Sequence, residues 1–63
     1  MSEYDLPKIG GPATRALASI GVTRLNQLVD HDEEELLALH GFGPRAMRII
    51  IEGLESVGLA LRS

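Results

Sequence analysis

The spacing of apolar residues along the chain predicts helices joined by glycine turns. From Ala13 to Ile20, apolar residues fall at i, i+3, i+4 and i+7, which is one face of an α-helix. Pro12 suits the start of that helix because its missing N–H would be unpaired there, and Gly21 suits the cap that ends it. No stretch alternates apolar and polar residues as a half-buried strand would. The pattern therefore predicts an all-α fold.

Two shorter helices are expected next. Thr23 is a good N-cap for a helix that carries Leu25, Leu28 and Val29 on its apolar face and stops near residue 30. Asp32, followed three residues later by a glutamate, resembles a capping box. It predicts a helix from residue 33 to about 39, whose acidic first turn agrees with the helix dipole.

The last predicted helix begins at Pro44 and runs to about Val57. Its apolar face is unusually wide, because Ile49 and Ile51 lie about 100° to either side of Ile50 on a helical period. Charged side chains occupy the opposite face. A wide apolar face of this kind either packs into a core or serves a partner.

The most informative stretch is the turn before this helix, Leu39-His40-Gly41-Phe42-Gly43-Pro44-Arg45-Ala46. Two glycines around one apolar residue allow a sharp turn, and the N–H groups at the helix start suit an anion such as phosphate. Arg45 opposes the helix dipole at a cost of about 0.3–1 kcal/mol, which suggests that its charge serves a partner. The alternative for Arg48 is a surface ion pair with Glu52, four residues later.

An internal repeat relates this turn to the beginning of the chain. A shift of 33 positions aligns Leu6 with Leu39, Ile9 with Phe42, Gly10 with Gly43, Ala13 with Ala46, Arg15 with Arg48 and Leu17 with Ile50. The prolines are offset by one position. Neither unit can bury a core alone, so we expect them to pack about a pseudo-two-fold axis with both turns on one side. The first copy lacks room for its leading helix.

Length and composition narrow the class of protein. The chain has 63 residues, and we expect residues 1–63 to form one small domain. A domain of this size buries only about 60% of the surface that its unfolded chain exposes. The chain has no cysteine, and therefore neither a disulfide nor a thiolate metal site. It shows no apolar run near the roughly 20 residues that cross a bilayer and no signal-peptide pattern, so we expect a cytoplasmic protein without a membrane partner.

The charges are segregated along the chain. The net charge of −3 is unusual for a nucleic-acid-binding protein, which normally shows a basic footprint. Acidic residues crowd positions 30–35, whereas Lys8, Arg15, Arg45 and Arg48 belong to the two glycine turns and the helices after them. If the two turns meet, one face of the protein is basic and another is acidic.

No set of residues has the spacing of an active site. His31 and His40 stand nine positions apart, which is not a metal-ligand spacing, and the glutamates at 33–35 splay around a helix. Gly10-Gly11 is not a nucleotide-binding loop, because such a loop follows a strand. We therefore expect a protein that is not an enzyme, with no catalytic residue, no resident metal site and no cofactor.

Leu39-His40-Gly41-Phe42-Gly43, followed by Ala46, resembles the hairpin of the helix-hairpin-helix family, whose form is apolar-x-Gly-apolar-Gly. The first copy, Leu6-Pro7-Lys8-Ile9-Gly10, keeps only the second glycine. Across residues 6–61 the arrangement also resembles the C-terminal domain of the bacterial RNA polymerase alpha subunit. The resemblance implies a compact, SAM-like tandem helix-hairpin-helix domain of four to five helices. Its hairpins would lie near 7–12 and 39–44, with the first leading helix truncated.

The resemblance further implies non-catalytic, largely sequence-independent DNA binding, in which hairpin amides and nearby basic side chains hold phosphates. Carried over by position, the DNA-binding residues would be Lys8, Ile9, Gly10, Gly11 and Arg15 of the first hairpin and Gly41, Phe42, Gly43, Arg45 and Arg48 of the second. The partner would be duplex DNA, bound weakly and salt-dependently, and hairpin carbonyls would be able to coordinate a monovalent cation. One departure is Pro12, which stands where the polymerase domain has its principal DNA-contacting arginine.

A second interpretation remains open from the residues themselves. The acidic net charge, the small size and the wide apolar face around Ile49 and Ile51 are also typical of a protein-interaction module or a homodimer with no DNA role. Binding of generic duplex that depends on Arg45 and Arg48 would separate the two.

Overall fold

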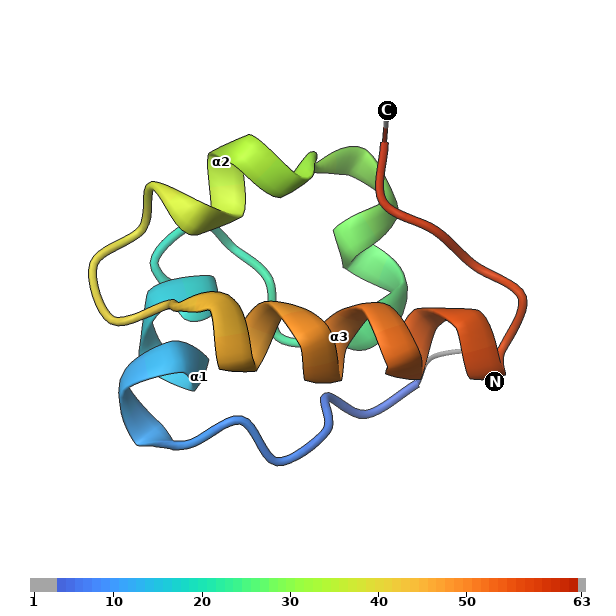
Figure 1. The fold of residues 1–63 in the computed structure, drawn as a ribbon, viewed down its shortest axis with the longest axis horizontal. Coiled ribbons are helices and arrows are strands. Elements are labelled where there is room, and N and C mark those ends of the chain that lie inside the picture. Colours follow the sequence, from blue (N-terminus) through green and yellow to red (C-terminus); the bar gives the residue numbers. More distant parts are fainter. Residues whose placement is uncertain (1–3, 63) are drawn as a thin grey trace.

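The computed structural model describes residues 4–62, and every regular element in that range is a helix (Figure 1). The elements are α1 (Gly11–Ala18), the 3₁₀ helix η1 (Leu25–Asp30), the short helix α2 (Glu33–Leu37) and α3 (Pro44–Ser56). The prediction of an all-α fold is confirmed. No helix among these residues is long and apolar enough to cross a membrane.

Glycines with positive φ end the two longer helices as the sequence predicts. Gly21 has φ +83°, and the N–H of Val22 donates to the Leu17 carbonyl at 2.9 Å, which closes a Schellman cap on α1. Gly58, with φ +77°, ends α3 in the same way, because the Leu59 amide donates to the Leu54 carbonyl at 2.8 Å. The predicted span of α3 is correct to within one residue.

The helix predicted after Thr23 forms, but as a 3₁₀ helix with a different cap. Its N-cap is Arg24, and the Gln27 Oε1 atom accepts hydrogen bonds from the amides of Thr23 and Arg24 at 2.7 and 2.9 Å. Leu25 and Leu28 are both buried, whereas Val29, the third residue of the predicted apolar face, is only half-buried. The spacing of three residues between the two leucines places both on one face of a 3₁₀ helix, which has three residues per turn. Only the prediction of a Thr23 cap on an α-helix is wrong.

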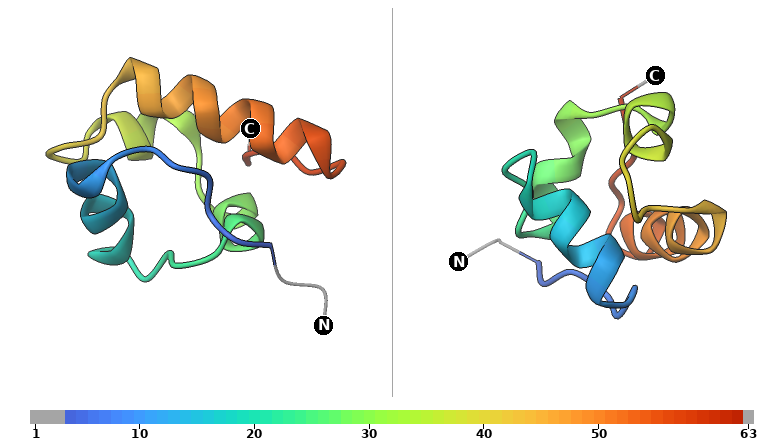
Figure 2. Two further views of the ribbon diagram at one scale, coloured as in Figure 1. Left: turned by 90° about the horizontal axis from the view of Figure 1, so that it is seen from below. Right: turned by 90° about the vertical axis from the view of Figure 1, so that its left-hand side faces the viewer.

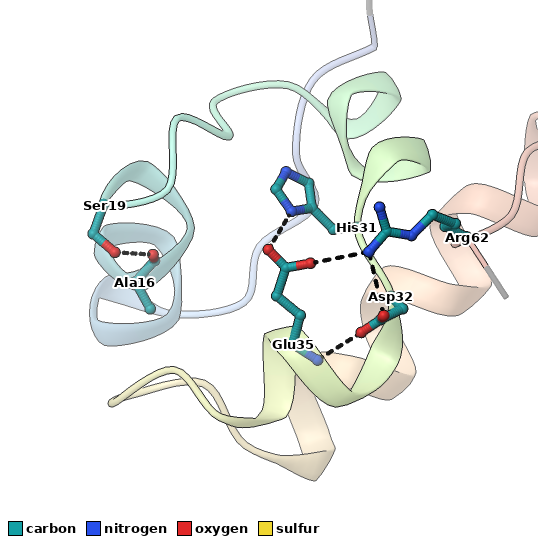
Figure 3. Close-up of polar contacts among 6 residues, drawn as sticks. All are labelled: Ala16, Ser19, His31, Asp32, Glu35 and Arg62. Carbon is teal, nitrogen blue, oxygen red and sulfur yellow. Dashed lines mark hydrogen bonds and ion pairs between the residues drawn. The ribbon is translucent and has the colours of Figure 1, made fainter.

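Asp32 caps α2 as predicted, and the C-terminal tail is tied to this cap (Figure 3). The Glu35 amide donates to Asp32 Oδ1 at 2.8 Å; this bond, reinforced by Arg62, lowers the pKa of Asp32 below its ordinary value. The Arg62 guanidinium lies 3.3 Å from Asp32 Oδ2 and 3.7 Å from Glu35 Oε1. The Glu35 carboxylate also meets His31 Nδ1 at 2.8 Å, so only the aspartate half of the predicted capping box forms.

The segment before α1 is extended and lies along α3 in the opposite direction (Figures 1 and 2). The Leu25 amide donates to the Tyr4 carbonyl at 2.8 Å, and Arg24 pairs with Asp5 at 2.7 Å. Pro7 reaches the C-terminal half of α3 at Gly53. The first glycine turn is therefore preceded by an extended segment that covers α3, whereas the second glycine turn is preceded by the helix α2.

One apolar core unites these elements. Its buried members are Ala13, Ala16, Leu17, Val22, Leu25, Leu28, Leu36, Phe42, Ala46, Met47, Ile50 and Leu54. They come from all four helices, and from the residues between them in the case of Val22 and Phe42. The core therefore fixes the start of α1 and the start of α3 relative to each other.

Replacing Gly53 by alanine is expected to raise the free energy of unfolding by about 0.5–1 kcal/mol, because glycine is a poor helix former. A Cβ at this position would lie 3.6 Å from Leu25 Cδ2 and 3.7 Å from Pro7 Cγ, which are ordinary contacts. Urea denaturation followed by circular dichroism measures the change. A decrease would contradict the described packing of Pro7 and Leu25 on α3.

Candidate nucleic-acid interface

The turn that precedes α3 packs directly against the start of α1. Gly41 has φ +93°, and a Cβ on it would lie only 3.1 Å from the Pro12 carbonyl oxygen. Phe42 is 4% exposed, and its amide donates to the Leu39 carbonyl at 3.2 Å. Phe42 therefore anchors the turn in the core, while Gly41 allows the turn to approach α1 closely.

The two helices that meet at this turn have unneutralised N-termini. The N-caps are Gly10 for α1 and Gly43 for α3, and neither makes a side-chain capping bond. The first turns of α1 and α3 contain no acidic residue, whereas α2 has an aspartate cap and three glutamates. Free first-turn amides and the positive end of the dipole make α1 and α3, and not α2, attractive to an anion.

Basic side chains surround these two N-termini. Lys8 and Arg45 line a crevice of about 320 Å³ together with Ile9, Gly10, Ala46 and Ile49. The Arg15 guanidinium folds back over the start of α1, since its Nη1 lies 3.1 Å from where a Cβ on Gly11 would be. Arg48 is exposed on the next turn of α3. The two turns thus bring four cations to one end of the molecule.

These four cations are not neutralised within the part of the chain that the structure describes. The ion pairs between residues 4 and 62 use Arg24, His31 and Arg62 as their basic partners. The surface pair between Arg48 and Glu52 that the sequence allows is not among them. The charges are therefore available to an external partner, and Figure 1 shows this end of the molecule at the left, with the C-terminal tail at the right.

Most corresponding positions of the repeat have matching environments; the exception is the pair of Ile9, which is half-buried, and Phe42, which is buried. Gly10 and Gly43 are N-caps, Ala13 and Ala46 are buried, and Leu17 and Ile50 are fully buried; Leu6 and Leu39 are half-buried, and Arg15 and Arg48 are exposed. The turns themselves differ in backbone conformation. The first has its positive φ at the N-cap Gly10 itself, and the second has it two residues before the N-cap, at Gly41.

Most of the candidate residues lie together at the hairpin end, but they differ in how far they are exposed. Lys8, Gly10, Gly11, Arg15, Gly41, Arg45 and Arg48 are exposed, Gly43 and Ile9 are half-buried, and Phe42 is buried. The side chain of Phe42 is therefore unable to contact a ligand, and its amide already serves the turn. Pro12, which contacts Gly41, was not a candidate, because no local pattern reveals a contact between residues so far apart in the chain.

Comparisons with known proteins add no assignment. The chain matches no protein-family model, and comparisons with curated proteins and with solved structures give no significant match. The properties of this end of the molecule have to be judged from its own geometry and charge.

Proposed function

We propose that this protein is a non-catalytic, largely sequence-independent module that binds duplex DNA through its hairpin end. The hairpin end is defined as residues 8–11 and 41–43 together with Arg15, Arg45 and Arg48. The observation that carries the proposal is the packing of Gly41 on Pro12, which sets side by side two helix N-termini that have no side-chain capping bond. Around them lie four cations that no carboxylate of residues 4–62 neutralises.

The proposed contacts are to DNA phosphates. An anion at the start of α3 would accept hydrogen bonds from the Gly43 and Arg45 amides. It would also form an ion pair with the Arg45 side chain. An anion at the start of α1 would meet the Gly11 amide and the guanidinium of Arg15 above it. Phosphate contacts of this kind position a protein on duplex DNA without reading its sequence.

The acidic net charge is compatible with this assignment because the acids lie elsewhere. The carboxylates at 32–35 belong to α2 and its cap, and two of them, those of Asp32 and Glu35, pair with His31 and Arg62. They lower the overall attraction to DNA at long range, and screening by salt limits that effect to about 8–10 Å. We therefore expect weak binding that is led by local contacts.

The same observations support our proposal that the fold is a tandem helix-hairpin-helix, with one hairpin contributed by each half of the repeat. The matched N-caps, buried alanines and exposed arginines support two related units of unequal completeness. Because the first unit has an extended segment in place of a leading helix, we expect the grip on DNA to be asymmetric and led by the second hairpin.

Fluorescence anisotropy of a labelled duplex, titrated at two salt concentrations, tests the proposal. With about two to four phosphates neutralised, a fourfold rise in salt should weaken binding by about 10- to 150-fold. The double variant Arg45→Ala/Arg48→Ala should bind much more weakly and reduce the slope of log K against log salt by up to about 2.

The matched control is Arg62→Ala, which removes a partly exposed arginine far from the hairpin end. It is compared with the single variant Arg45→Ala, so that both proteins carry the same net charge. Only Arg45→Ala should lose affinity. Equal losses would show a nonspecific charge effect, and no binding by the parent protein at low salt would overturn the proposal.

A further inference from the structure

A second hollow, larger than the crevice at the hairpin end, lies away from that end of the molecule. It is a groove of about 740 Å³ between α2, the C-terminal half of α3 and the tail at 59–62. Its floor is apolar and is formed by Leu37, Ile51, Leu54, Leu59 and Leu61. Leu37 is 43% exposed, and Ile51, Leu59 and Leu61 beside it are half-buried. The floor therefore leaves apolar surface in contact with water.

The tail that forms one wall of this groove is fixed to α2. The Arg62 amide donates to the His31 carbonyl at 2.9 Å, and its guanidinium contacts Asp32 and Glu35 (Figure 3). The Leu59 amide donates to the Leu54 carbonyl at 2.8 Å, which anchors the other end of the tail on α3. The groove is thus a preformed feature with two helical walls and one tethered wall.

The rim of the groove is negatively charged. Four carboxylates line it, those of Asp32, Glu33, Glu34 and Glu55. Among the described residues, the one cation in the lining is Arg62, which is already paired with carboxylates of α2 and its cap. The last turn of α3 has no basic residue, so the negative end of that helix dipole adds to the same potential.

We propose that this groove binds a basic amphipathic helical segment of another protein. Leucine-like side chains on one face of the segment would cover the floor around Leu37 and Ile51, and lysines or arginines beside them would pair with Glu34 and Glu55. A helix of about 14 residues is roughly 21 Å long. That length matches the molecule, whose extents are 29 × 23 × 19 Å.

Charge and shape favour this occupant over the others. Nucleic acid and acidic membranes are repelled by the four carboxylates. A second copy of this chain carries four of its six lysines and arginines around the hairpin end, where Phe42 and Ala46 are buried and Ile9 and Ile49 are half-buried, so this end offers no long apolar stripe to fill the groove. The inference does not rest on DNA binding, because the two surfaces share no residue.

Titration of the protein with a labelled helical peptide tests the assignment. The probe has about 14 residues, only leucine and lysine, with the leucines on one helical face. The parent protein should bind it. Leu37→Lys should weaken binding by about tenfold or more, and Glu55→Lys by about three- to tenfold. The matched control Glu52→Lys makes the same charge change on α3 at a residue that does not line the groove, and it should change the affinity by less than about twofold.

Three further measurements distinguish binding in the groove from loss of the fold, from bulk charge attraction and from self-association. Circular dichroism of Leu37→Lys checks that the fold persists, and Glu55→Lys provides a second, exposed test if it does not. A scrambled peptide of the same composition should bind much more weakly, and equal binding would reduce the effect to bulk charge and overturn the proposal. If the parent protein shows a doubled solution mass that Leu37→Lys abolishes, and does not bind the peptide, the groove serves self-association and the proposal is overturned.

The double variant Arg45→Ala/Arg48→Ala should leave the peptide affinity unchanged.

Discussion

Replacing Ile50 by alanine should lower the free energy of unfolding by about 2–5 kcal/mol, the usual cost of a large cavity in a core. Ile50 is fully buried on the face of α3 that enters the core. At about 0.05–0.15 kcal/mol per residue, a domain of this size has roughly 3–9 kcal/mol in total. The variant should therefore be close to unfolding at room temperature, which urea and thermal denaturation by circular dichroism would measure.

The neighbours of Ile50 provide the matched controls. Ile49 and Ile51 carry the same side chain on the same helix, but both are half-buried. Ile49→Ala and Ile51→Ala should each cost less than half as much as Ile50→Ala, because part of the removed surface already faces water. Equal losses at all three positions would contradict the described rotation of α3. Ile51→Ala should also weaken peptide binding, since Ile51 lies on the floor of the groove.

The width of the apolar face of α3 follows from the three surfaces that this helix meets. Ile50 enters the core, Ile49 lines the crevice at the hairpin end, and Ile51 lines the acidic groove. The sequence shows that three consecutive isoleucines spread over about 200° of a helix, which is more than one core contact requires. Which of them meets which surface depends on elements far away in the chain.

Signals that act within a few residues were sufficient for much of the fold. Asp32 caps α2, Gly21 and Gly58 end their helices, and α3 has nearly its predicted bounds, because each of these features depends on neighbouring amides and carbonyls. The extended segment before α1 was not predictable in the same way. It is held by the bond from Leu25 to Tyr4 and by the Asp5–Arg24 pair, which join residues about 20 positions apart.

The candidate interface shows the same division. The glycines and basic residues were visible as a motif, but the motif does not reveal that the Phe42 amide is used within its own turn or that Arg15 folds over Gly11. The acidic run at 30–35 and the apolar Ile51 were visible as possible partner surfaces, but their assembly into one groove was not. Its third wall exists because Arg62 returns to Asp32, a pairing across 30 positions that has no local signature.

Replacing Gly41 by alanine should lower the free energy of unfolding by about 2–4 kcal/mol. About 1–2 kcal/mol comes from the positive φ of +93°, which alanine adopts poorly. The rest comes from overpacking, because the new Cβ would lie 3.1 Å from the Pro12 carbonyl, a backbone atom that is unable to turn away. Urea denaturation monitored by circular dichroism measures the total.

Gly58→Ala separates these two causes. Gly58 also has positive φ, +77°, but a Cβ on it would have no heavy atom of the described residues within 4 Å, so only the conformational cost of about 1–2 kcal/mol is expected. The excess loss in Gly41→Ala measures the contact between the hairpin turn and α1. If that contact sets the two helix N-termini together for DNA, folded Gly41→Ala should bind duplex more weakly than folded Gly58→Ala at the same salt concentration. Equal stability losses in the two variants would show that the contact with Pro12 does not hold the turn in place.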